Sequence, residues 1–334
     1  MTNKKGHAVA SFFSGAGGLD LGFTNSGFNI VYANDNWSGC WVTFEKNHNL
    51  NIDKRSIVDV KPEDIPEVIG FCGGPPCQSW SLAGEMKGIK DNRGKLFYEY
   101  LRLLKDKKPL FFLAENVAGI VCKTHMPEFE KIIKEFKKIG YNVSWRLLNT
   151  KDFNTPQERK RVIVIGYRED LKKTFDFDKL KTSKEISLKE AIGDLPPSTP
   201  AKSKPNEKLA IPNHEHMTGS FSPIFMSRNR RKDWKDYSFT IQAGGRQAPL
   251  HPSSPNMKKI SADKWEFEKD EGVRRMSVRE AARIQTFPDD FIFYYNNVAD
   301  GYKMIGNAVS VKFAEAIATQ IKKDLDEFLN NKTD

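Results

Sequence analysis

One cysteine of this chain, Cys77, occupies a setting in which a thiol could act as a nucleophile. Two glycines and two prolines precede it, in Gly73-Gly74-Pro75-Pro76, and they predict a sharp turn followed by a rigid approach. The apolar run 68–72 before the turn predicts a short buried strand. The thiol would then lie at the carboxyl edge of a sheet, where open α/β folds bind ligands. The alternative is a small buried apolar residue, the usual place of a free cysteine.

Charged side chains stand at the ends of two other predicted strands. Glu115 follows the apolar run 110–113, and Arg161 begins the run 161–166, with Arg159 two positions earlier. A carboxyl group can neutralise charge that develops on a substrate, and a guanidinium group can hold a carbonyl oxygen. For any single arginine the alternative is a solvated place on the surface.

A glycine turn near the N-terminus predicts a nucleotide-type binding site. The run 8–13 predicts a strand, Gly15, Gly17 and Gly18 form the turn, and Leu19 opens an apolar helix. Asp35 ends the next predicted strand, where a carboxylate can accept hydrogen bonds from ribose hydroxyls.

The glycine spacing disfavours two common cofactors. A dinucleotide fingerprint that starts at Gly15 requires a third glycine at position 20, which is Asp20. No lysine completes a phosphate-binding loop either. An adenosine cofactor without a pyrophosphate remains, and S-adenosylmethionine is the common one.

Strand and helix patterns alternate through the first half of the chain. Apolar residues recur at helical spacing over 96–104 and 129–136, and strands are predicted at 143–148 and 161–166. This alternation predicts an α/β fold with a doubly wound, mostly parallel sheet. Beyond residue 167 the chain becomes rich in lysine, proline and loops. We expect a large domain over 1–170 and 301–334, and a small loop-rich domain over 171–300.

Composition limits the class of protein. The 334 residues are 39% hydrophobic and carry a formal charge of +10, which favours a polyanionic partner. No run of 18 apolar residues and no signal-peptide core is present, so a cytoplasmic protein without a membrane segment is expected. The four cysteines lack zinc-site spacing, and His214-Glu215-His216 is a weak cluster, so no metal is expected.

Six segments together resemble the motifs of the DNA cytosine-C5 methyltransferases, in order and over nearly the whole chain. They are 13–20 (FSGAGGLD), 74–78 (GPPCQ), 115–117 (ENV), 157–161 (QERKR), 279–288 (REAARIQTFP) and 306–309 (GNAV). The resemblance implies a bacterial enzyme that takes a methyl group from S-adenosylmethionine and modifies duplex DNA. A cognate restriction endonuclease acting on the same site would be its functional counterpart.

The resemblance also implies residue roles. Cys77 would add to C6 of a flipped cytosine, Glu115 would stabilise the ring at N3, and Arg159 and Arg161 would hold O2 and nearby backbone. The cofactor would be bound by Phe13, Gly15, Gly17, Gly18, Leu19, Asp35, Ser56, Pro75 and Asn307. Two departures from the family pattern are visible: Ser56 stands where Asp is common, and Ser310 stands where Pro is usual.

The small domain is expected to read the DNA sequence. Two segments, 225–230 and 242–247, resemble those of bacterial enzymes that modify GGCC, which implies methylation of its inner cytosine. Arginine is the commonest reader of guanine, so Arg228, Arg230 and Arg246 are the candidate readers. Ser79, Arg231 and Lys232 are the remaining candidate DNA contacts. An RNA cytosine-C5 methyltransferase and a non-catalytic DNA-binding protein are the alternatives.

Overall fold

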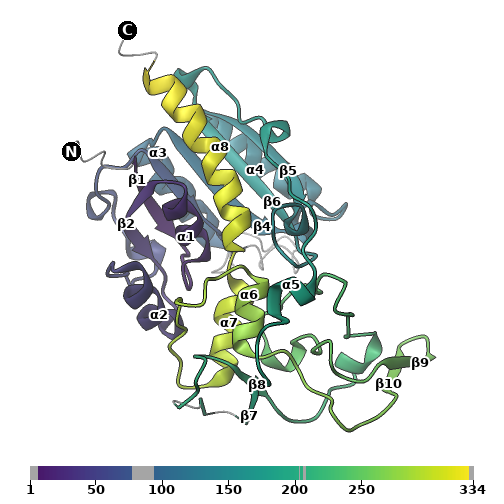
Figure 1. Cartoon of the computed structure of the whole chain (residues 1–334). Coiled ribbons are helices and arrows are strands. Elements are labelled where there is room, and N and C mark those ends of the chain that lie inside the picture. Colours follow the sequence, from purple (N-terminus) through teal and green to yellow (C-terminus); the bar gives the residue numbers. More distant parts are fainter. Residues whose placement is uncertain (1–6, 77–93, 203, 206–207, 331–334) are drawn as a thin grey trace. The chain divides into compact units, whose positions relative to one another are not determined.

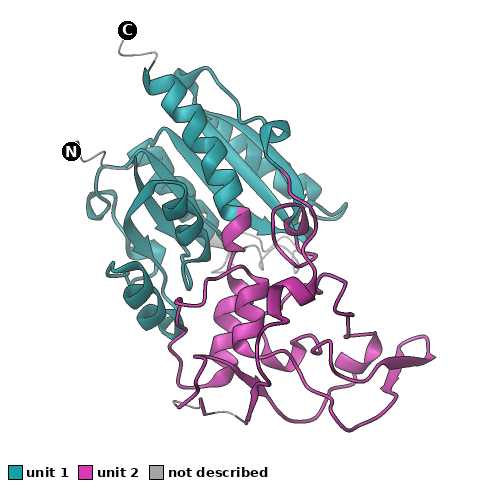
Figure 2. Ribbon diagram, in the orientation of Figure 1, with its two compact units in different colours: residues 1–149, 160–181, 314–334 teal, residues 150–159, 182–313 magenta. Residues whose placement is uncertain are grey.

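The computed structural model describes residues 7–76, 94–202, 204–205 and 208–330. The chain divides into two compact units, coloured separately in Figure 2. Unit 1 comprises residues 1–149, 160–181 and 314–334, and unit 2 comprises residues 150–159 and 182–313.

Unit 1 is built on a six-stranded sheet with the order β2-β1-β3-β4-β6-β5 (Figure 1). The strands are β1 (His7–Phe12), β2 (Phe28–Asn34), β3 (Gly70–Gly73), β4 (Phe111–Val117), β5 (Tyr141–Asn149) and β6 (Lys160–Arg168). β1 pairs in parallel with β2 and β3, and β3 pairs in parallel with β4. β6 is antiparallel to both of its neighbours, β4 and β5. The sequence prediction of a mostly parallel α/β sheet is confirmed, with β6 as the reversed strand.

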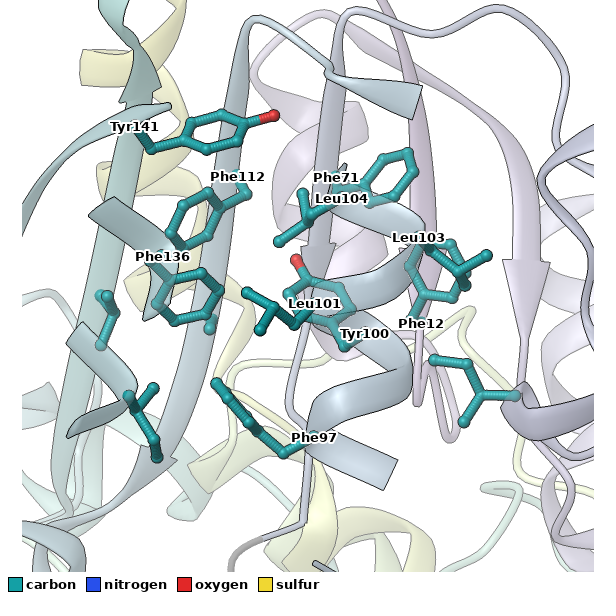
Figure 3. Close-up of a cluster of buried hydrophobic side chains, with 14 of the residues drawn as sticks. Phe12, Phe71, Phe97, Tyr100, Leu101, Leu103, Leu104, Phe112, Phe136 and Tyr141 are labelled. Atoms are coloured by element: carbon teal, nitrogen blue, oxygen red, sulfur yellow. The ribbon is translucent and has the colours of Figure 1, made fainter. Parts of the chain in front are cut away.

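Helices cover both faces of this sheet (Figure 1). They are α1 (Gly18–Asn25), α2 (Ser38–His48), α3 (Gly94–Lys107), α4 (Met126–Lys138) and α8 (Val311–Asn330), the last belonging to unit 1 from residue 314. α3 and α4 pack on one face, where Figure 3 shows Phe71 and Phe112 of the sheet among Tyr100, Leu104 and Phe136 of the helices. The Tyr100 hydroxyl donates to the Leu113 carbonyl at 3.1 Å, so its polar end is satisfied inside the core.

The opposite face of the sheet is covered by α1 and α8. Phe23 of α1 stacks against Phe111 of β4 with ring centroids 6.3 Å apart. α8 is fixed by polar contacts as well, since buried Asp324 accepts from the Tyr167 hydroxyl at 2.8 Å and pairs with Lys173 at 2.9 Å. Because helices cover both faces of the sheet, the loops that contain the predicted site follow the carboxyl ends of β1 to β4.

Unit 2 has little regular structure. Its helices are α5 (Leu188–Ile192), α6 (Val278–Ile284) and α7 (Val298–Asn307), and its strands are β7 (Thr199–Ala201), β8 (Glu215–Met217), β9 (Met257–Ser261) and β10 (Lys264–Phe267). The Ser-x-x-Glu patterns at 187–190 and 277–280 predict capping boxes, and Ser187 and Ser277 each begin a helix with one. No helix within the described ranges is long and apolar enough to cross a membrane.

The two capping serines differ in burial, which gives a test of helix capping in unit 2. Ser277 is fully buried, and its hydroxyl accepts from the Glu280 amide and contacts His214 Nδ1, both at 3.0 Å. We expect Ser277→Ala to reduce the free energy of unfolding by about 2 kcal/mol, and Ser187→Ala by about 1 kcal/mol. Urea denaturation of both variants measures this, and equal losses would contradict the role assigned to burial.

Candidate active site

The carboxyl ends of β3 and β4 bring the predicted catalytic segments together. Their parallel register pairs Gly73 with Ala114, so that Gly74 and Glu115 follow side by side. A Cβ atom at Gly74 would lie 3.3 Å from Glu115 Oε2, and the Asn116 side-chain amide donates to the Pro75 carbonyl at 3.0 Å. The turn that leads into Cys77 is thus fixed to the strand end that carries the carboxyl group.

The reversed strand β6 supplies a cation to the same place. Arg161 Nε lies 2.7 Å from Glu115 Oε1, and both side chains are largely buried, with 12% and 13% of their surface exposed. Because β6 starts where β4 ends, Arg161, the second residue of β6, lies at the carboxyl edge of β4. An ion pair shielded from water is stronger than a surface pair and fixes the direction of the carboxyl group.

Cys77 and Ser79 lie outside the described residues. Pro75 is buried and Pro76 half-buried, and they are the last described residues before Cys77.

The glycine turn has the geometry of a binding loop. Asp35 accepts from the Gly15 amide through one oxygen and from the Trp37 amide through the other, each at 2.8 Å. Phe13 is held at φ 55°, a conformation that is strained for a bulky residue and that marks functional turns. A Cβ atom at Gly15 would meet nothing within 4 Å, so the backbone is open there to a ligand. The Gly15 amide and Asp35 fit an adenosine cofactor.

Gly17 is required for a different reason. It adopts φ +86°, and a Cβ atom there would lie 2.0 Å from His48 Nε2, so helix α2 fits only against a glycine. Gly18 and Leu19, both buried, begin α1 directly after it.

The position expected to bind adenine holds a half-buried serine. Ser56 caps a short 3₁₀ turn, accepting from the Val58 amide at 3.4 Å. Asp53, a nearby carboxylate, is engaged by Arg55 at 2.6 Å and by the Tyr32 hydroxyl at 2.8 Å. Hydrogen bonds from Arg55 lower the pKa of Asp53. Asp59 is exposed.

Asp20 is a buried carboxyl group whose importance the sequence does not reveal. It is fully buried in α1, and neither of its oxygens has a hydrogen-bond partner in the described part of the chain. Burial raises its pKa to about 7, although the neighbouring Ser11 hydroxyl acts in the opposite direction. The sequence signals were its place at the end of the 13–20 motif and the mismatch with a dinucleotide site, which needs glycine there, and neither indicates burial.

Three further motifs meet inside unit 2 through buried amides. Gln285 donates to the carbonyls of Ile305 and Ala308 and accepts from the side chains of Gln157, at 3.0 Å, and Ser310. The serine that stands in place of the usual proline is therefore a hydrogen-bond donor within this network.

Arg159 is part of the same arrangement. It is buried, and its guanidinium donates to the Gly306 and Ala308 carbonyls at 2.8 and 3.1 Å, on either side of exposed Asn307, and to the Ile241 carbonyl. Arg159 and Arg161 thus have different partners: backbone carbonyls of unit 2 for Arg159, and Glu115 of unit 1 for Arg161.

The candidate DNA contacts of unit 2 differ in exposure. Arg228 and Arg246 are exposed, whereas Arg230 is buried and donates to the carbonyls of Ile224 and Phe225, both at 2.9 Å. Arg231 pairs with Asp233 at 2.7 Å and donates to the Ser254 carbonyl. Sequence spacing cannot distinguish an exposed arginine from a buried one in an irregular segment.

The last two candidates are Lys232, for DNA contact, and the His214-Glu215-His216 cluster, for metal binding. The Lys232 ammonium lies over the rings of Phe239 and Tyr237, 4.9 and 5.6 Å from their centroids. Among the described residues no group of three or more His, Cys, Asp or Glu side chains could hold a metal ion.

Comparison with known proteins matches this chain to one family. The model of the C-5 cytosine-specific DNA methylases matches residues 7–323. Type II methyltransferase M.MthTI of Methanothermobacter thermautotrophicus is 61% identical over 327 residues, covering 96% of this chain and 99% of that protein. M.FnuDI of Fusobacterium nucleatum is 49% identical over 327 residues, covering 96% and 95%.

Solved structures share the fold at lower identity. A prophage-encoded protein of E. coli superposes with a TM-score of 0.74 at 22% identity, covering 96% of this chain and 99% of that one. The S. pombe Dnmt2 methyltransferase gives 0.65 at 17% identity, covering 96% and 98%.

The buried carboxyl group of Asp20 predicts a pH dependence of stability. Its usual pKa is 3.8, and in the folded protein it is about 7, so the folded state binds more protons between these values. Stability contributed by the protonated group is present at low pH and is lost as pH rises through about 7. Asp20→Asn, which mimics the neutral form, should therefore gain stability over the unmodified protein by about 1 kcal/mol per pH unit between the two pKa values.

Chemical denaturation at pH 5, 6, 7 and 8 measures the difference. Asp106→Asn, which changes an exposed carboxylate of α3, is the matched control. Stability curves for Asp20→Asn that run parallel to those of the unmodified protein would contradict the assignment.

Proposed function

Since the chain belongs to the C-5 cytosine-specific DNA methylase family and is a type II DNA (cytosine-5-)-methyltransferase, we propose that it uses S-adenosylmethionine and modifies the inner cytosine of GGCC. A restriction endonuclease acting on the same site would be its functional counterpart. Membership of this family sets aside a dinucleotide-dependent enzyme, which the glycine spacing already disfavours, and a non-catalytic binding protein. Similarity over nearly the whole chain to type II methyltransferases, at 61% and 49% identity, favours DNA over RNA as the substrate.

The observation that carries the catalytic proposal is the junction of β3 and β4. Asn116 ties the Pro75 carbonyl to the end of β4, and Glu115 beside it is oriented by Arg161 at 2.7 Å. A thiol two residues after Pro75 and a carboxyl group on the neighbouring strand are the pair needed to activate a pyrimidine ring. The rigid prolines reduce the freedom of the chain that carries the thiol.

In the proposed mechanism the Cys77 thiolate adds to C6 of a cytosine that has been rotated out of the duplex. The Glu115 carboxyl group hydrogen-bonds N3 and the exocyclic amine and so stabilises the charge that addition places on the ring. C5, now nucleophilic, takes the methyl group that the sulfonium cofactor supplies. Loss of the C5 proton and expulsion of the thiolate restore the aromatic ring.

The remaining unit 1 residues would bind the cofactor. Asp35, at the end of β2, would accept hydrogen bonds from the ribose while it holds the Gly15 amide in place. Phe13 would stack on the adenine, and its positive φ would give the ring the orientation that stacking requires. Ser56 would contact the adenine without contributing charge. Gly17, Gly18, Leu19 and Pro75 would shape the loop, and Asn307 would support the pocket.

The target sequence is the least constrained part of the proposal. Its support is the resemblance of segments 225–230 and 242–247 to those of GGCC enzymes, together with the exposure of Arg228 and Arg246. Each guanine read by a bidentate arginine would add about 1–3 kcal/mol of discrimination. Arg230 would have to leave its internal carbonyl partners in order to read a base, whereas Arg231, Lys232 and Ser79 would contact phosphates.

Bisulfite sequencing of a plasmid from cells that express the protein tests the target. We expect protected cytosines only at the inner position of GGCC, on both strands. Protection at another sequence would overturn the GGCC assignment and leave the methyltransferase intact. A complete absence of protection in cells that contain folded protein would contradict the activity itself.

The role of Cys77 is tested separately. Cys77→Ala should lower turnover at least about a thousandfold, because the covalent step is lost, while binding to duplex DNA is kept. It should also fail to form the covalent adduct with 5-fluorocytosine DNA that the unmodified protein forms. Cys122→Ala, at an exposed cysteine, is the control and should trap normally. Residual turnover above one part in about a thousand would argue against a thiolate mechanism.

A further inference from the structure

A segment of unit 2, residues 219–225, carries an exposed apolar side chain next to a buried aromatic one. Ile224 is 72% exposed, whereas its neighbour Phe225 is fully buried. Phe225 packs with Leu250 and Met257, and its ring centroid lies 4.8 Å from that of Phe221. The 219–225 segment belongs to no strand, and beyond the local contacts at Ser222 its carbonyls are held by side chains from elsewhere in unit 2.

Arg275 is the principal side chain that does so. It is 2% exposed, and its guanidinium group donates to the Gly219 carbonyl at 3.1 Å and to the Ser220 carbonyl at 3.0 Å. The same group lies 4.0 Å from the centroid of the Phe221 ring and 5.5 Å from that of Phe225. One planar group therefore fixes two successive carbonyls and two rings of the 219–225 segment.

Arg230 holds the other end of the segment. Its guanidinium group lies 5.0 Å from the centroid of the Phe225 ring and donates to the carbonyls of Ile224 and Phe225. The backbones of the two arginines are joined through Leu250, whose amide donates to the Arg230 carbonyl at 3.0 Å and which forms a bridge with Arg275. Arg275 and Arg230, which together clamp the 219–225 segment, are thus anchored to the core of unit 2.

Within the described residues, the charge of Arg275 and Arg230 is not compensated by a carboxylate. No carboxylate among the described residues forms an ion pair with Arg275 or Arg230, and Arg275 Nε is buried without a hydrogen-bond partner there. Burial, and secondarily the nearby charge of Arg246, lower the pKa of Arg275, and burial together with Arg228 does the same for Arg230. A protein that only needed rigidity would gain more from neutral or paired groups, because unpaired buried charge is costly. Positive charge on Arg275 and Arg230, close to exposed Arg246 and Arg228, suits a polyanion.

We propose that Arg275 is a positioning residue for DNA recognition, which sets the 219–225 segment and its exposed Ile224 in the conformation that engages the target site. The inference rests on the proposed function, since the polyanion is taken to be the duplex DNA that the protein methylates. Arg275 acts through backbone carbonyls and aromatic rings, and it need not touch a base. Lysine would keep the positive charge but lacks the fork that reaches two carbonyls at once.

Arg275→Lys therefore separates geometry from charge. We expect its affinity for a duplex with one cognate site to fall about 10- to 100-fold at fixed salt, with a smaller loss on a duplex without the site. Affinity for S-adenosylmethionine should be unchanged. Fluorescence anisotropy gives the two DNA affinities, and titration calorimetry gives the cofactor affinity.

Arg279→Lys is the matched control. Arg279 is also fully buried in unit 2 and also donates to backbone carbonyls, those of Pro212, Pro288 and Phe291, but it does not contact the 219–225 segment. It should lose thermal stability as Arg275→Lys does while keeping the preference for the cognate duplex. An equal loss of preference in both variants would reduce Arg275 to a purely structural role and overturn the proposal.

A second variant covers the case in which Arg275→Lys does not fold. Phe221→Leu leaves the guanidinium group in place and removes the ring beneath it, so it should weaken cognate binding in the same direction by about 3- to 10-fold. Unchanged cognate preference in this variant would also overturn the proposal. The cognate duplex carries the site found by bisulfite mapping, so an incorrect GGCC assignment changes only the sequence of the probe. An incorrect role for Arg275 would instead appear in the ratio of the affinities for the cognate and non-cognate duplexes.

Discussion

The parallel pairing of β3 with β4 is the constraint on which the geometry of the candidate active site depends. The pairing aligns Gly73 with Ala114, so the two chains leave the sheet at the same level and carry the Pro75-Pro76 turn and Glu115 out together. The pairing of β3 with β1 adds a second requirement, since a Cβ atom at Gly73 would lie 2.5 Å from the Phe12 carbonyl oxygen and only glycine fits there. The pairing with β4 thus sets the level at which the proline turn leaves the sheet, and the pairing with β1 sets the residue type before it.

The reversal of β6 adds the cation that this edge needs. In a wholly parallel sheet the next strand would end here, and an arginine at its start would lie at the opposite edge. Because β6 runs the other way, Val117 pairs with Arg161, and the guanidinium group reaches diagonally to Glu115 two residues away. The ion pair thus follows from strand direction, not from proximity in sequence.

Local patterns in the sequence predicted the strands of the unit 1 sheet and several of its helices. The glycine turn, the acid at the end of β2 and both capping boxes depend on interactions within a few residues or on a standard βαβ geometry, and they are present. The direction of β6 was not predictable, because a buried antiparallel strand and a buried parallel one have the same apolar composition. The burial of Arg159 and Arg230 was also hidden, since it depends on carbonyls of residues distant in the chain, such as Gly306, or of an irregular segment, such as Ile224.

Asn116 has a consequence for any attempt to transplant this site. Its amide nitrogen donates to the Pro75 carbonyl while its amide oxygen accepts from the Val117 backbone, so both ends of the group are in use. Aspartate would lose the donor and leucine would lose both contacts, although either fills a similar volume. The smallest portable unit is therefore a thiol-bearing turn, a carboxylate and the amide that joins them. A graft that copied only the two reactive groups would leave the turn without its connection to the sheet.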